Sequence, residues 1–139
     1  LTGATAVTAA IGGNRLDTVL LSSKDITFNE AAAGTFNTNT LSFTGKNGLT
    51  ELTATFTNLA ADSLQNTTIT TDSEIRGHHI VLNDDNHNSN AAVGSAEKKF
   101  GNFTLSDAKT LNVNNADFYA GVISKTKGQG TVTFNAPQN

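Results

Sequence analysis

Large apolar residues return along this chain at nearly regular intervals, and this spacing restricts the fold more than any other feature. The residues that carry it lie 28, 26, 23 and 29 positions apart: Phe28, Phe56, Leu82, Leu105 and Phe134. The mean of these intervals suits the length of one coil of a parallel β-helix. In such a fold each turn stacks its strands on those of the turn before, so equivalent residues recur once per coil. We therefore expect an all-β fold, a right-handed parallel β-helix of about five coils, with Phe28, Phe56 and Phe134 in one interior column.

Short runs of alternating apolar and polar residues predict half-buried strands between these turns. The clearest runs end at residues that we expect to fill the interior together: Phe28, Phe43, Phe56, Leu82, Leu105, Val113 and Phe134. A β-sandwich remains the alternative, since some strands recur at its spacing of about 8 to 12 residues. The hairpin dipeptides Asn-Gly and Asp-Gly occur once, at Asn47-Gly48, which favours the β-helix.

The 139 residues suffice for one domain, which we assign to 1–139. The segment from Ile11-Gly12 onward is echoed in the second half of the chain, from Val93-Gly94 onward. This echo predicts repeat units at 4–57 and 91–136, with an insert-like stretch at 58–90. The chain starts without Met and ends in Pro-Gln-Asn, so we expect it to be part of a longer protein.

The composition excludes several classes of function. The sequence has no Cys, so neither disulfides nor thiolate chemistry are available. Charged residues make up 15% and the net charge is −3, which argues against a nucleic-acid partner. With so few charges, any adhesion should depend weakly on salt. No apolar run approaches the length of a membrane-spanning helix.

A polar stretch from His78 to Asn88 holds the densest group of possible metal ligands, of which the candidates are Asp84, Asn86, His87 and Asn88. The spacing Asp84-x-Asn86-x-Asn88 is similar to the start of a calcium loop. However, Ser89 and Ser95 stand where such a loop needs Gly and a bidentate Glu. His78 and His79 are adjacent and should face opposite sides of a strand. We expect no metal here, but a solvated loop between coils.

Catalytic patterns are weak. Asp72 with Glu74, and Asp84 with Asp85, are paired carboxylates by residue type only, although Arg76 lies close in sequence. No nucleophile elbow, phosphate loop or dinucleotide fingerprint is present in the sequence. We therefore expect no enzyme activity, no catalytic residue and no cofactor.

Exposed side chains predict a possible surface for binding a partner. Phe118-Tyr119 places one aromatic ring on each face, so the Tyr119 ring is a candidate for contact. The residues of a possible binding surface are then Tyr119, His79, Asp84 and Asp85.

A series of motifs in the second half of the chain resembles a known family. In order they read Val-Gly, Phe-Gly-Asn-Phe-Thr-Leu, Thr-Leu-Asn-Val, Ala-Asp-Phe-Tyr-Ala-Gly-Val-Ile and Gly-Thr-Val-Thr-Phe-Asn. They are similar to passenger repeats of bacterial autotransporters, most of all the rickettsial surface cell antigens of the outer membrane protein B group. The resemblance is best over 91–136 and poor over 58–90. The family supplies no catalytic residues.

This resemblance implies an extracellular location on the bacterial cell surface. The expected role is a rigid display scaffold, acting as an adhesin or a surface coat. Its partners would be a host-cell receptor or surface glycan, with any membrane attachment through a C-terminal β-barrel outside this sequence. The open alternatives are a self-assembling extracellular filament subunit, joined through its end strands or to neighbouring coils, and a β-helical carbohydrate-active enzyme.

Overall fold

The computed structural model describes residues 6–7, 11–22, 25–34, 36–44, 51–59, 63–72, 77–83, 86–106, 109–115, 117–126 and 130–138. The described residues form twelve β-strands and no helix. The strands are β1 (Ala6–Val7), β2 (Ile11–Leu21), β3 (Ile26–Gly34), β4 (Phe36–Phe43), β5 (Thr53–Leu59), β6 (Thr68–Thr71), β7 (His79–Leu82), β8 (His87–Ser89), β9 (Phe100–Leu105), β10 (Thr110–Val113), β11 (Ala120–Lys125) and β12 (Thr131–Phe134).

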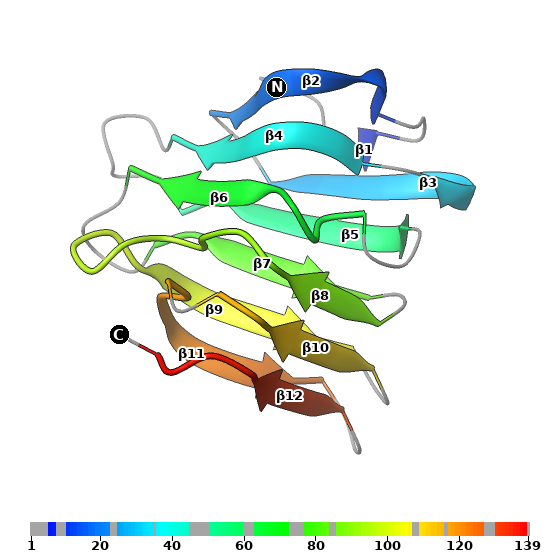
Figure 1. The fold of residues 1–139 in the computed structure, drawn as a ribbon. Coiled ribbons are helices and arrows are strands. Elements are labelled where there is room, and N and C mark those ends of the chain that lie inside the picture. The colour runs from blue at the N-terminus through cyan, green and yellow to red at the C-terminus, as the bar shows by residue number, and fades with distance from the viewer. Residues whose placement is uncertain are drawn as a thin grey trace.

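These strands form three sheets, which are the sides of one solenoid (Figure 1). Sheet A has the order β1-β3-β5-β7-β9-β11, sheet B the order β2-β4-β6, and sheet C the order β8-β10-β12. Every strand pairing is parallel. The stack makes about four turns, close to the five expected. The predicted parallel β-helix is confirmed, and the β-sandwich alternative is wrong; the right-handed sense stays a prediction.

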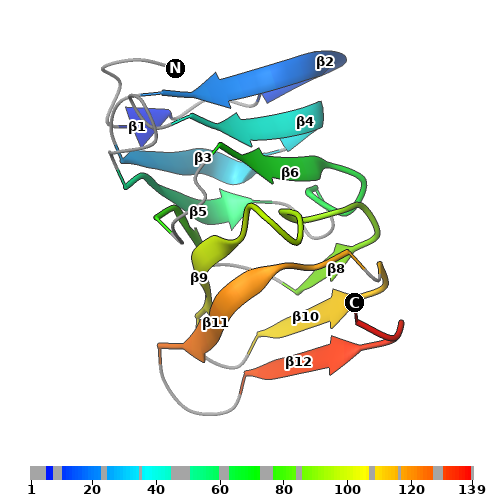
Figure 2. The same cartoon turned by 90° about the vertical axis from the view of Figure 1, so that its left-hand side faces the viewer.

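Sheet A runs along the whole stack, but the sheet that faces it is not the same in the two halves of the chain (Figure 2). Sheet B lies opposite the first strands of sheet A, and sheet C lies opposite the last ones. Among the described residues, sheet B is continued into the later coils by two single bridges, from Ile69 to Val93 and from Val93 to Phe118. Sheet A runs unbroken through residues of both proposed repeat units and of the segment between them. The division of the chain at 58–90 therefore stays a prediction from sequence alone.

Four of the five regularly spaced residues form one interior column, which includes Phe28 and Phe56 as predicted. Phe28 pairs with Phe56, Phe56 with Leu82, and Leu82 with Leu105, each one coil further along sheet A. All four side chains are buried. The intervals between these four residues therefore mark successive coils, as the sequence predicted.

The placement of Phe134 in that column is wrong. Phe134 lies in sheet C, where it pairs with Val113, and its side chain is 46% exposed. The position next to Leu105 in sheet A belongs to Lys125, which follows Leu105 after a shorter stretch of chain than separates any earlier pair of the column. Because the last coil is shorter than the earlier ones, the step from Leu105 to Phe134 passes beyond sheet A and reaches another side of the solenoid.

Aromatic rings fill the N-terminal half of the core. The rings of Phe28 and Phe56 stack at 4.9 Å with an interplanar angle of 11°. Phe36 of β4 meets both rings edge-on, at 5.1 and 5.4 Å. These offset and edge-to-face contacts are the arrangements that aromatic pairs favour. They join sheet A to sheet B through the middle of the solenoid.

Candidate functional site

The paired histidines face opposite sides of the solenoid wall, as predicted. His78 is buried, with 1% of its surface exposed, and lies just before β7. His79 points outward and has its Nε2 atom 3.8 Å from Oε2 of the exposed Glu51. Only one histidine of the pair can therefore contact a partner from outside, and that residue is His79.

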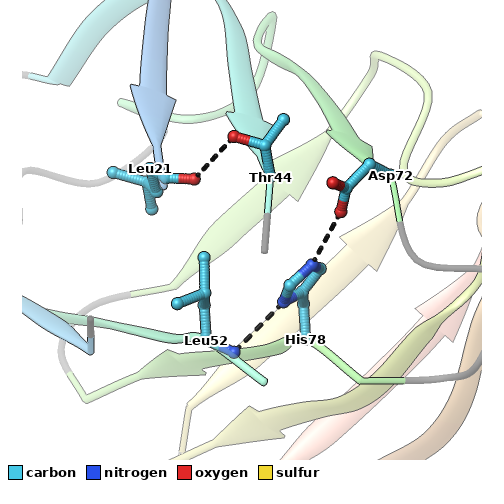
Figure 3. A network of polar contacts seen from close by, with 5 residues as sticks. All are labelled: Leu21, Thr44, Leu52, Asp72 and His78. Atoms are coloured by element: carbon cyan, nitrogen blue, oxygen red, sulfur yellow. Dashed lines mark hydrogen bonds and ion pairs between the residues drawn. The ribbon is translucent and has the colours of Figure 1, made fainter. Parts of the chain in front are cut away.

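The buried histidine belongs to a network of polar contacts between coils (Figure 3). Its Nδ1 atom accepts a hydrogen bond from the backbone N–H of Leu52 at 3.1 Å. Its Nε2 atom lies 3.1 Å from Oδ1 of Asp72. Since Nδ1 accepts, the pattern assigns the ring proton to Nε2, which then donates to the carboxylate. One end of the ring thus satisfies a backbone amide and the other an acidic side chain.

The Asp72–His78 pair has the composition of a general-base dyad but cannot act as one in this arrangement. A histidine base needs a free ring nitrogen directed at the proton that it removes. Here the lone pair of Nδ1 is used by the Leu52 amide, in a place that solvent does not reach. The pair is therefore a structural clasp between the strand that ends before Asp72 and the strand that begins after Leu52.

Neighbouring corner contacts extend this clasp towards the earlier coils (Figure 3). The amide of Asp72 donates to the carbonyl of Phe43 at 3.0 Å, and the amide of Thr44 donates to the carbonyl of Leu21 at 2.8 Å. The Thr44 hydroxyl reaches the same Leu21 carbonyl at 3.3 Å. Polar side chains at this corner satisfy backbone groups where the strands of sheet B end.

The candidate metal ligands of the next coil lie in or beside a strand. Residues 87–89 form β8, so their interpretation as a solvated loop is wrong. The His87 side chain is buried. Oδ1 of Asn86 accepts from the Thr110 amide at 2.8 Å, and Oδ1 of Asn88 accepts from Nδ2 of Asn112 at 2.9 Å. These oxygens bond to the following coil; Asp84 and Asp85 lie outside the described residues.

A second asparagine column follows at the end of sheet C, and sequence reasoning missed it. Nδ2 of Asn114 donates to Oδ1 of Asn90, and Nδ2 of Asn135 donates to Oδ1 of Asn114, both at 2.7 Å. The signal was present, because these asparagines follow one another at the length of a coil, 24 and 21 residues. Such ladders join identical side chains of stacked parallel strands.

Tyr119 is partly exposed, and its neighbour Phe118 is buried against Phe103 at 5.2 Å between ring centroids. The predicted split of the two aromatic side chains between core and surface is therefore confirmed. The Tyr119 carbonyl accepts from the amide of Phe100 and its own amide donates to the carbonyl of Val93, so two hydrogen bonds hold the residue to the preceding coil.

A short loop, residues 94–99, lies beside Tyr119. Gly94 has a φ of +68°, and a Cβ added there would lie 3.3 Å from the Tyr119 Cβ. The loop then closes on itself, since the Ser95 amide donates to the Lys98 carbonyl at 2.9 Å and the Lys98 amide to the Ser95 hydroxyl at 3.1 Å. Its exposed residues include Glu97 and Lys98. We call Glu97, Lys98 and Tyr119 the loop surface.

The outer face of sheet A has a different character. One outward column, in register on the five strands β3, β5, β7, β9 and β11, consists of Thr27, Thr55, Val81, Thr104 and Ser124. The Thr104 and Ser124 hydroxyls bond to each other at 2.9 Å. No residue of this column is charged, whereas the loop surface carries both an acid and a base.

Two features are absent from the described residues. No group of three or more His, Cys, Asp or Glu side chains converges there in a way that could hold a metal ion. Within the same part of the chain, no helix has the length and hydrophobicity to cross a membrane.

No protein-family model matches the chain, and no curated protein or solved structure shows significant similarity to it. The autotransporter resemblance therefore stays a prediction. The structure brings together Tyr119 and the 94–99 loop, places His79 opposite Asn102 of β9, and uses Asn86 and Asn88 within the stack.

Proposed function

We propose that this chain is a rigid display scaffold of a bacterial cell surface, which acts as an adhesin or a surface coat. The observation that supports the proposal is that polar side chains form hydrogen bonds between successive coils. The bond from the Leu52 amide to His78 and the Asn90–Asn114–Asn135 ladder join one coil to the next, as the parallel strands do. A stack whose coils are joined by such contacts is stiff, and loops on a stiff scaffold are suited to binding.

The loop surface is the site that such a scaffold would present. Its loop is closed by two hydrogen bonds and lies beside Tyr119, so little ordering is needed when a partner binds. Tyrosine supplies an amphipathic ring that can stack on a sugar or on another side chain. The extracellular location and the host-cell receptor or glycan as partner come from the family resemblance described above.

Binding to host cells tests this proposal. We expect the purified chain to bind cultured cells, and the double variant Tyr119→Ala, Lys98→Ala to lose most of that binding. Thr55→Ala is the matched control, because Thr55 lies on the outer face of sheet A, away from the loop surface. A double variant that binds as well as the control would reject the loop surface as the contact site.

The salt dependence of the same assay tests the physical basis. The loop surface combines Glu97 with Lys98, so it carries no excess of one sign, and the whole chain has a net charge of only −3. We expect binding to persist at about 0.5 M salt, where the Debye length falls to several ångströms. Binding that disappears at this salt concentration would mean that charge attraction, and not the loop surface as described, holds the partner.

The enzyme alternative has its own test. We expect no turnover of pectin, hyaluronan or peptidoglycan by the purified chain. Asp72→Asn is the diagnostic variant, since it keeps the shape of the side chain that contacts His78 but removes the carboxylate. Turnover that this variant abolished, in a protein with an unchanged melting temperature, would overturn the non-enzymatic proposal.

A further inference from the structure

The outer face of sheet C is built from two residue types. Its strands β8, β10 and β12 lie side by side along one side of the stack (Figure 1). The outward positions are the even-numbered ones of 86–90 and 110–114 and the odd-numbered ones of 131–135, because the residues between them on the first two strands are buried: His87, Ser89, Leu111 and Val113. Six of these nine positions are Asn and three are Thr. We call them the asparagine–threonine face.

This face is open and uncharged. All nine side chains are at least partly exposed. None of them is acidic, basic, aromatic or aliphatic, although such side chains are exposed elsewhere on the molecule, as Glu97, Lys98 and Val122 are. The face therefore offers hydroxyl, amide and methyl groups and nothing else.

Hydrogen bonds between coils hold the amides of this face in place. Nδ2 of Asn112 donates to Asn88, and the column Asn90–Asn114–Asn135 is joined by two bonds of 2.7 Å. The same column reaches one coil further back, since Nδ2 of Asn90 lies 3.4 Å from Oε1 of Gln65. Side chains that are already fixed lose little conformational entropy when a ligand binds.

The ladder uses only part of each amide. A carboxamide has two N–H donors and an oxygen with two lone pairs. Asn114 uses one donor towards Asn90 and one lone pair towards Asn135. The ladder thus leaves one donor and one acceptor of the same group for a molecule that lies on the face, and a Thr hydroxyl can likewise both donate and accept.

The chemistry of the face narrows the choice of ligand. An anionic partner finds no Lys or Arg on it, in a chain whose net charge is −3. Protein interfaces draw most of their binding energy from Trp, Tyr and Arg, and the face has none of them. An apolar partner would bury the amides without hydrogen bonds, which costs free energy. A neutral ligand rich in hydroxyl groups meets none of these objections.

We infer that the asparagine–threonine face binds a neutral polysaccharide. Neighbouring strands lie about 4.8 Å apart and outward residues recur about every 6.6 Å along a strand, so the face measures roughly 10 by 13 Å and repeats its donors and acceptors in both directions. A polysaccharide repeats its hydroxyl groups along its chain, so successive coils can bind successive sugar units. The inference goes beyond the proposed function and does not rest on it, because this face and the loop surface lie on different segments of the chain.

Affinity electrophoresis of the 139-residue chain in native gels tests the inference. The neutral probes are hydroxyethylcellulose, galactomannan and dextran, and alginate is the anionic probe. We expect at least one neutral polysaccharide to retard the chain, and alginate not to retard it. No retardation by any neutral probe, or equal retardation by alginate, overturns the inference.

Charges placed on the face locate the site. The double variant Thr131→Glu, Thr133→Glu changes two exposed positions of β12 and leaves the ladder amides in place. We expect the Kd for the polysaccharide to rise by about tenfold or more, because a neutral ligand desolvates the new carboxylates without pairing them. Thr55→Glu, Thr57→Glu is the matched control, with the same charges at the same spacing on β5 of sheet A, and it should bind like the wild type. Equal loss in the control, or no loss in the β12 variant, would reject this face.

A second β12 variant removes the dependence on added charge. Thr131→Val, Thr133→Val deletes the two hydroxyl groups and keeps the branched shape that suits a strand. We expect a melting temperature like that of the wild type and binding that is weaker by several-fold. Wild-type binding in this folded protein would show that the β12 hydroxyl groups do not contact the ligand.

The loop-surface variant Tyr119→Ala, Lys98→Ala separates this inference from the proposed function. We expect the polysaccharide to retard it as much as the wild type, even where its binding to cultured cells is lost. Loss of retardation in this variant would place the glycan on the loop surface and overturn the inference about sheet C, with the proposed function still standing. A wild type that is retarded by the polysaccharide but does not bind cells would reject the proposed function alone.

Discussion

Replacing Phe56 with alanine removes the ring at the centre of the aromatic cluster. The Phe56 side chain is fully buried, stacks on Phe28 at 4.9 Å and receives the edge of Phe36 at 5.4 Å. Because parallel strands fix the backbone on both sides of the ring, the cavity has little room to collapse. We expect a loss of about 3–5 kcal/mol in the free energy of unfolding, the usual range for a buried phenylalanine.

The matched control is Phe134→Ala, the same substitution at a residue that the sequence placed in the same column. Phe134 is 46% exposed and contacts Phe118 at 6.3 Å. About half of its transfer free energy is therefore at stake, and we expect a loss of about 1 kcal/mol. The comparison uses identical chemistry, so the difference between the two variants measures burial alone.

Urea denaturation followed by circular dichroism measures both losses. With an m-value of about 1–3 kcal/mol/M, Phe56→Ala should lower the unfolding midpoint by at least ~1 M, and Phe134→Ala by much less. The melting temperature should fall by roughly 10 °C for Phe56→Ala. Equal losses for the two variants, or a larger one for Phe134→Ala, would refute the assignment of Phe134 to an exposed terminal position.

The remaining predictions concern single positions. Gly94→Ala should lower the free energy of unfolding by about 1–3 kcal/mol, because Gly94 has φ +68° and a Cβ there meets two carbonyl oxygens at 2.9 Å. Gly13→Ala is the control and should be neutral in the same urea titration, since a Cβ at Gly13 meets nothing within 4 Å. His78→Ala should cost about 1–3 kcal/mol by leaving a buried amide without its acceptor, and His79→Ala less than about 1 kcal/mol; reversal of this order would contradict the clasp. Asn114→Ala removes two ladder bonds and should cost about 1–2 kcal/mol, with faster amide hydrogen exchange in β12; unchanged exchange would count against a role in holding the last coil.

The alternation of apolar and polar residues predicted the strands well, because successive side chains of any strand point to opposite faces. The runs that end at Phe28, Phe43, Phe56, Leu82 and Leu105 are all strands with the expected side chains inside. The strand at His87–Ser89 was missed, since its inward residues are His and Ser, which do not look like core residues in a sequence. Their burial depends on the coils that lie before and after them.

The candidate site was predicted less completely than the fold. Tyr119 was identified as a surface aromatic, and His78 and His79 were correctly placed on opposite faces. The bond from the Leu52 amide to His78 joins residues 26 positions apart, so it appears only when the coils are stacked. The same is true of the loop beside Gly94, whose nearness to Tyr119 depends on the next coil.

The sequence by itself determined which side chains point inward on most strands and, through coils of similar length, which of them form the column from Phe28 to Leu105. The tertiary structure alone decided which side of the solenoid each strand joins, which placed Lys125 beside Leu105 and Phe134 at an exposed edge of sheet C. The reason is that alternation has a period of two and reports only inside or outside. Sheet membership depends on the length and path of every turn before the strand, and these add up along the chain.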